Sequence, residues 1–129
     1  MKGSSFDTRF FVELFYSSEE RKLGRIKEVL LSSRPNYVSA AVLSEIYSLI
    51  LSREGREVAD LRAAAIRKDF HIVAVDSVIA LEAGLIRHDS HIPFADSLVA
   101  ATARVMKLAC YTDDPHFGSV RGVSIRWLE

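Results

Sequence analysis

The chain has 129 residues, with 17 basic side chains, 17 acidic side chains and 49% hydrophobic residues, which indicates a single globular domain over residues 1–129. A net charge of zero excludes a strongly basic protein that binds nucleic acid by bulk electrostatics. The single cysteine, Cys110, excludes an intramolecular disulfide and a cysteine-rich zinc site, and it favours a cytoplasmic location. The most apolar helical stretch, residues 37–51, is too short and too polar to span a membrane.

The first third of the chain is predicted to contain one short strand and two helices. Residues 4–6 form a weakly indicated strand, after which Asp7 caps a helix that continues to about residue 16. Ser17 and Glu20 have the spacing of a capping box, which predicts a second helix after them. Pro35 and its neighbours break that second helix.

The middle of the chain is predicted to form two more helices and a strand. Ser39 can cap a helix over residues 40–52, and Gly55 separates this helix from a charged one that ends near residue 69. The segment 70–75 is β-branched and apolar, which is typical of a buried strand.

The last third continues this alternation of helices and strands. Asp76 or Ser77 caps one helix, and Pro93 begins the next. Short strands are expected at 108–112 and 123–127, the last of them at an edge of the sheet. Strands separated by helices predict an α/β fold, with a parallel sheet covered by helices on both faces.

Acidic side chains directly follow several of the predicted strands. Asp7, Asp76 and the Asp113–Asp114 pair lie at carboxyl ends of strands, where α/β proteins bind their ligands. Carboxylates that share a cleft repel one another and need a compensating cation, and oxygen ligands favour Mg²⁺ or Mn²⁺. For any one of these aspartates alone, a helix N-cap is the simpler explanation.

Two further carboxylates lie on predicted helices. Glu45 is at the edge of the apolar stripe of its helix, so it needs a partner, for which a salt bridge to an arginine is the non-functional alternative. Asp96 is in the first turn of its helix, where the helix dipole favours an acid. Leu98, Thr102, Val105 and Met106 mark the side expected to be buried. Asp96 shares the other side with Ala100 and Ala103, so it is free to face a cleft.

Four motifs occur in order across essentially the whole chain. They are FDTRFFVELF with Asp7 and Thr8, VSAAVLSEI with Glu45, IPFADSLVAATA with Asp96, and CYTDDPHF with Thr112, Asp114 and Phe117. Each motif alone is weak, but four in order and at this spacing are specific. The sequence resembles the PIN domain family, and within it the small VapC-type toxin ribonucleases of type II toxin–antitoxin pairs.

This resemblance implies a three-layer α/β/α sandwich around a short parallel sheet. It implies a metal-dependent endoribonuclease in which Asp7, Glu45, Asp96 and Asp114 hold Mg²⁺ or Mn²⁺ and carry catalysis. The family pattern Thr-x-Asp-x-x-Phe selects Asp114 rather than Asp113 as the fourth acid. The implied partners are an RNA substrate, a second copy of the chain in a homodimer, and a small antitoxin protein in the active-site groove.

Side chains next to the four acids are candidates for supporting roles. Thr8, Ser39, Thr112 and Asp113 could hydrogen-bond a ligand or a metal-bound water, although hydroxyls beside helix caps need no function. Arg9 could contact RNA, although a solvated surface charge is the simpler explanation.

Other features leave further alternatives open. His116 could approach a substrate, but a surface histidine in a turn is the simpler interpretation. The apolar residues of helices 8–16 and 40–52 exceed one core-facing stripe, so they suggest either deep burial or a dimer or antitoxin surface. The alternative functions are an RNA-processing nuclease without an antitoxin and a catalytically inactive module that binds RNA or protein.

Overall fold

Five short parallel strands form one sheet in the order β3-β2-β1-β4-β5. The structure is a computed structural model that describes residues 3–129. The strands are β1 (Ser4–Phe6), β2 (Asn36–Ser39), β3 (His71–Val73), β4 (Ala109–Tyr111) and β5 (Ile125–Arg126).

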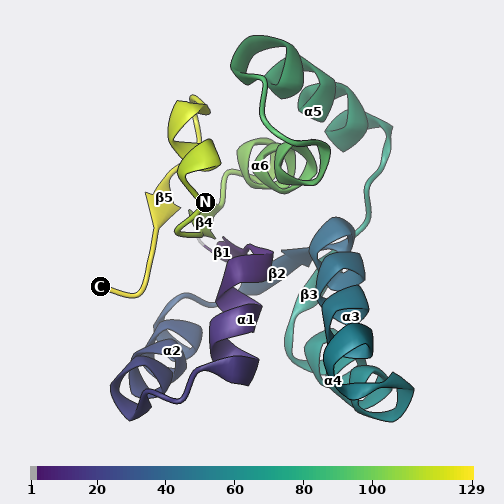
Figure 1. The fold of residues 1–129 in the computed structure, drawn as a ribbon. Coiled ribbons are helices and arrows are strands. Elements are labelled where there is room, and N and C mark those ends of the chain that lie inside the picture. Colours follow the sequence, from purple (N-terminus) through teal and green to yellow (C-terminus); the bar gives the residue numbers. More distant parts are fainter. Residues whose placement is uncertain (1–2) are drawn as a thin grey trace.

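Helices cover both faces of this sheet. Figure 1 shows α5 and α6 on one face and α1 to α4 on the other, which confirms the predicted three-layer α/β/α architecture. No helix within residues 3–129 has the length and apolar character needed to cross a membrane. The helices are α1 (Thr8–Tyr16), α2 (Glu20–Ser32), α3 (Ala40–Glu54), α4 (Arg56–Asp69), α5 (Ser77–Ser90), α6 (Phe94–Met106) and the short 3₁₀ helix η1 (Pro115–Ser119).

The direction in which the chain adds strands reverses at β1. The chain passes from β1 outward through β2 to β3, and then returns to place β4 on the other side of β1. The helices before this return lie on one face of the sheet and those of the return lie on the other (Figure 1). The carboxyl ends of β1 and β4 therefore form a topological switch point, which is where open α/β sheets bind ligands.

An aromatic cluster fixes the ends of these two strands. Phe6 and Tyr111 are register partners whose rings stack with centroids 5.1 Å apart, and Phe10 from α1 packs on Phe6 at 4.5 Å. All three side chains are buried. Because Asp7 and Thr112 are the next residues along each strand, this packing holds them side by side at the switch point.

The burial of α6 differs from the prediction. Residues 97–103 are buried around the whole helix, so Ala100 and Ala103 are in the core, whereas Val105 is exposed. The reason is that α6 lies between the sheet and α5, which leaves it no solvent-facing side in this stretch (Figure 1). Asp96 precedes the buried stretch and remains partly accessible, as expected.

Two of the strands also differ from expectation. β2 was not predicted, because it is short, follows a proline, and begins and ends with the weak strand formers Asn36 and Ser39. The strand predicted as buried at 70–75 is only three residues long and partly exposed. Among residues 3–129 it pairs with β2 alone and therefore forms an edge of the sheet.

The predicted helix starts are mostly confirmed. Asp7 and Ser39 each accept a hydrogen bond from a backbone N–H in the first turn of the following helix. The predicted capping box at Ser17 and Glu20 is wrong, because the Ser17 hydroxyl accepts a hydrogen bond from Glu19 N at 3.2 Å. This local turn delays the helix, and α2 begins without a side-chain cap.

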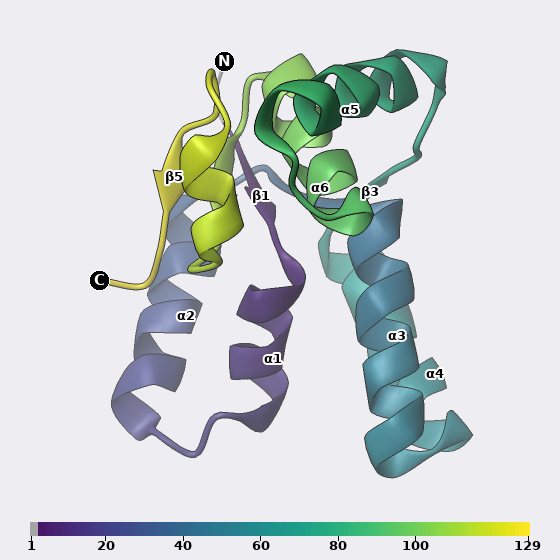
Figure 2. The same ribbon diagram turned by 45° about the horizontal axis from the view of Figure 1, so that its top comes forward.

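The last strand confirms the prediction of an edge strand. β5 pairs in parallel with β4 and has no other strand neighbour within the described residues 3–129. The segment after β5 lies beside α2 (Figure 2), where Arg25 Nε donates to the carbonyl oxygen of Leu128 at 2.9 Å.

Candidate active site

Asp7 lies at the centre of the switch point. Its Oδ1 accepts a hydrogen bond from Thr8 N at 2.7 Å, and its Oδ2 accepts one from the Thr112 hydroxyl at 2.7 Å. Burial raises the pKa of Asp7 to about 6, these hydrogen bonds lower it, and the nearby charges of Asp96 and Asp114 raise it. The carboxylate is therefore held in place while its charge is disfavoured.

Thr112 joins the ends of β1 and β4. Its hydroxyl donates to Asp7 and accepts a hydrogen bond from Asp114 N at 3.0 Å. Asp114 then caps η1, because its Oδ1 accepts a hydrogen bond from His116 N at 2.9 Å. One buried hydroxyl thus binds the Asp7 carboxylate and holds the main chain at Asp114.

Asp96 reaches the same place from α6, on the other side of the sheet from α1. His116 Nδ1 lies 3.0 Å from Asp96 Oδ2 and 3.0 Å from Asp114 Oδ1. Asp96, Asp114 and His116 each offer one potential ligand atom, and these three atoms lie within 4.8 Å of one another. This is the one such group of potential metal ligands among residues 3–129. Burial and the charge of Asp114 raise the pKa of Asp96, against the lowering effect of His116.

Glu45 approaches the cluster from α3. Its Oε1 accepts a hydrogen bond from the Thr8 hydroxyl at 2.7 Å, so its partner is a threonine and not the arginine considered above. Its charge is the smallest of the causes that raise the pKa of Asp96, which indicates that the two carboxylates lie near each other. Thr8 bridges two acids of the quartet, since its backbone N–H donates to Asp7.

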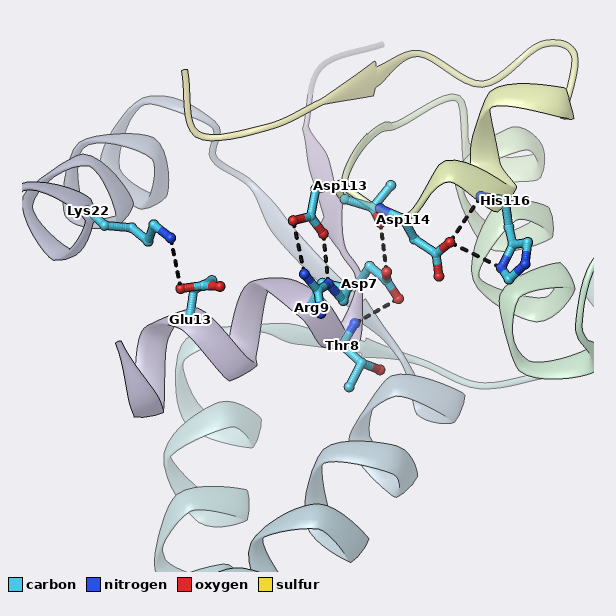
Figure 3. A network of polar contacts seen from close by, with 9 residues as sticks. Asp7, Thr8, Arg9, Glu13, Lys22, Asp113, Asp114 and His116 are labelled. Atoms are coloured by element: carbon cyan, nitrogen blue, oxygen red, sulfur yellow. Dashed lines mark hydrogen bonds and ion pairs between the residues drawn. The ribbon is translucent and has the colours of Figure 1, made fainter. Parts of the chain in front are cut away.

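Asp113 points away from this cluster and pairs with Arg9. The Arg9 guanidinium donates from Nε to Oδ1 at 2.7 Å and from Nη2 to Oδ2 at 3.1 Å (Figure 3). The pair lowers the pKa of Asp113 below its ordinary value. Arg9 remains half exposed, and its contact with RNA stays a prediction. Ser39 is buried, and its hydroxyl accepts a hydrogen bond from Ala41 N as the cap of α3.

One residue of the site was undervalued from the sequence. His116 was interpreted as a surface histidine and is indeed exposed, but its ring also contacts Asp96 and Asp114, and Figure 3 shows it beside Asp114. Its position two residues after Asp114, in the first turn of a helix that Asp114 caps, is the sequence signal for this contact. Asp76, by contrast, only caps α5, with Oδ1 accepting a hydrogen bond from Ile79 N at 2.9 Å.

The donors around Asp96 and Asp114 suit a hard divalent cation. The quartet supplies carboxylate oxygens, the ligands that Mg²⁺ and Mn²⁺ prefer. Asp7 and Asp96 both have raised pKa values, in part because neighbouring acids repel their charges. A bound cation offsets this repulsion, so the residues present fit a metal ion.

The sequence of this chain also matches the model of a known protein family. The PIN domain model matches residues 5–123, and the chain therefore belongs to the PIN domain family. Members of this family are generally nucleases that use divalent metal ions. A comparison with curated proteins gives no match.

Solved structures of toxin–antitoxin proteins share the fold. A chain of the DNA-bound VapBC complex from Salmonella typhimurium superposes with a TM-score of 0.84 at 16% identity, over 100% of both chains. VapC20 from Mycobacterium tuberculosis, a toxin that cleaves the sarcin-ricin loop, gives a TM-score of 0.75 at 28% identity, over 96% of this chain and 99% of that one. A toxin–antitoxin complex from Klebsiella pneumoniae gives 0.73 at 22% identity, over 94% and 95%.

Proposed function

We propose that this protein is a metal-dependent endoribonuclease that acts as the toxin of a toxin–antitoxin pair. The observation that carries the proposal is the approach of Asp96 and Asp114 at the switch point, with Asp7 and Glu45 outside that close group but near enough for charges to interact. In this proposal Asp7, Glu45, Asp96 and Asp114 hold Mg²⁺ or Mn²⁺.

Each part of the site has a distinct task in RNA hydrolysis. A divalent ion supplies charge neutralisation at the phosphate and lowers the pKa of a bound water. Asp96 and Asp114 lie closest together and bind the ion directly. Thr112 and the α1 N-terminus hold Asp7 in a fixed orientation, and Thr8 does the same for Glu45. Such preorganised contacts avoid a reorganisation cost during the reaction.

The proposed partners are the RNA substrate, a small antitoxin and a second copy of the chain in the cytoplasm. The similarity to chains of VapBC complexes supports the antitoxin. The helix over residues 8–16 was considered above for a partner surface, but its Phe10 and Phe11 are buried in the core. Exposed apolar side chains instead recur at helical spacing along α5, at Val78, Leu81 and Leu85, and such a stripe supports the homodimer.

The substitution Asp96→Asn tests the metal site, because it removes one charge with almost no change in shape. We expect RNA cleavage with Mg²⁺ or Mn²⁺ to fall at least about a hundredfold, while circular dichroism and the melting temperature show an intact fold. Asp89→Asn, at an exposed position of α5, is the matched control and should retain activity. Full activity of Asp96→Asn would refute the metal site.

A second experiment separates a toxin from a nuclease that works without an antitoxin. The protein is purified from its native host, and any bound protein is identified by mass spectrometry. A small partner that abolishes RNA cleavage supports the toxin. An active nuclease that is recovered alone supports an RNA-processing role.

A further inference from the structure

The imidazole of His116 is the one histidine ring that reaches the acid cluster among residues 3–129. Its Nδ1 lies 3.0 Å from a carboxylate oxygen of Asp96 and 3.0 Å from one of Asp114. His88 and His91, at the end of α5, are exposed and belong to no group of potential ligands.

The main chain fixes where the His116 ring lies. The Asp114 side chain accepts a hydrogen bond from His116 N, and the Ser119 hydroxyl donates to the His116 carbonyl oxygen at 3.0 Å. The next residue, Phe117, is fully buried and anchors η1 in the core. These contacts hold the backbone on both sides of His116, and the half-exposed ring is oriented by the contacts of Nδ1 with the two carboxylates.

The separations are those of ligands that share one ion. Two ligands at right angles around a cation, each about 2.1 Å from it, lie about 3.0 Å apart. His116 Nδ1 has this separation from both carboxylate oxygens. The same separation suits a hydrogen bond, so the chemistry of the third donor decides what the site prefers to bind.

Nitrogen and oxygen donors prefer different ions. Mg²⁺ is bound almost entirely through oxygen, whereas imidazole favours first-row transition metals. A site of carboxylates alone accepts Mg²⁺ readily, and one imidazole added to it strengthens the binding of Mn²⁺ and, further along the series, Co²⁺. One nitrogen donor thus makes the site prefer Mn²⁺ over Mg²⁺, a preference that the four carboxylates alone do not provide.

We propose that His116 is a nitrogen ligand of the catalytic ion and shifts the preference of the site from Mg²⁺ toward Mn²⁺ and Co²⁺. This inference rests on the proposed metal site and adds a fifth residue to it. His116→Gln is the informative variant, because glutamine can hydrogen-bond the same acids but is a poor ligand for transition metals. His88→Gln is the matched control on α5.

Metal binding to the full chain, measured without RNA, tests the proposal. Isothermal titration calorimetry gives the affinities for Mn²⁺ and for Mg²⁺. We expect His116→Gln to weaken Mn²⁺ binding about tenfold or more and to change Mg²⁺ binding by less than about threefold. Pulsed electron paramagnetic resonance of bound Mn²⁺ should show a directly coordinated ¹⁴N in the native protein and in His88→Gln, but not in His116→Gln.

The outcomes separate this inference from the proposed function. If the native protein binds neither ion, the metal site itself is refuted. If it binds both ions but no ¹⁴N coupling appears, His116 only positions the acids, and its role as a ligand is overturned while the nuclease proposal stands. Equal weakening of Mg²⁺ and Mn²⁺ binding in His116→Gln also overturns the proposed selectivity.

Discussion

Asp7 and Asp76 occupy the same local position in two regions of the molecule. Each comes shortly after a strand, and each caps a helix by accepting a hydrogen bond from a backbone N–H, at 2.7 Å and 2.9 Å respectively. Asp7 follows the central strand β1, is buried and has a pKa of about 6, whereas Asp76 follows the edge strand β3 and is exposed. Local sequence thus determines the cap, and the position of the strand in the sheet determines whether the cap can also serve a site.

The largest expected contrast between these two aspartates is in RNA cleavage. Asparagine caps helices as well as aspartate, so Asp7→Asn and Asp76→Asn both preserve the cap but remove the charge. We expect Asp7→Asn to lose at least about a hundredfold in kcat/KM, or about 2.7 kcal/mol, and Asp76→Asn to retain native activity. Cleavage of a labelled RNA with Mg²⁺ or Mn²⁺ measures both. Equal activity of the two variants would show that Asp7 is only a cap.

A second contrast concerns stability without metal. The pKa of Asp7 rises from 3.8 to about 6 on folding, so the folded protein binds this proton more tightly than the unfolded chain. The contribution of Asp7 to the free energy of unfolding is therefore highest below about pH 4, and it falls as the pH rises to about 6. Two units of pKa correspond to about 3 kcal/mol.

Asp7→Asn isolates this contribution, because Asp96 keeps its own raised pKa in both proteins. Urea unfolding in EDTA should show the variant to be more stable than the native protein at pH 7.5, with a difference that disappears near pH 4. The Thr112 hydroxyl can rotate to accept a hydrogen bond from the new amide, so the position stays paired. A variant that is less stable than the native protein at pH 7.5 would contradict the burial of an unfavourable charge.

The main outline of the site could be predicted from the sequence. Asp7 and Asp114 each follow a strand, and the motifs around Glu45 and Asp96 supplied the other two acids. The order of the strands could not be predicted from the sequence, since β2 was not predicted and β3 was expected to be buried. Without that order, the strand positions do not separate Asp76 from Asp7, and only the motif around Asp7 distinguished them.

The contacts between side chains were less predictable than the choice of residues. Helical periodicity indicated that Glu45 needs a partner and left a salt bridge to an arginine open as the non-functional alternative, but Glu45 is exposed and its partner is Thr8, 37 positions away. His116 was undervalued because its contact with Asp96 spans 20 residues and depends on how η1 packs against α6. Such contacts depend on tertiary packing, which a local pattern does not encode.

The smallest expected effect again concerns Asp76. Asp76→Ala removes the hydrogen bond to Ile79 N and leaves the first turn of α5 without its cap, at a cost of about 1 kcal/mol in the free energy of unfolding. Chemical denaturation measures this loss, and Asp76→Asn should recover most of it. RNA cleavage should stay unchanged in Asp76→Ala, since the residue lies at the edge of the sheet, beyond β2 from the switch point. A loss of cleavage without a matching loss of stability would instead place Asp76 in the site and remove the distinction from Asp7.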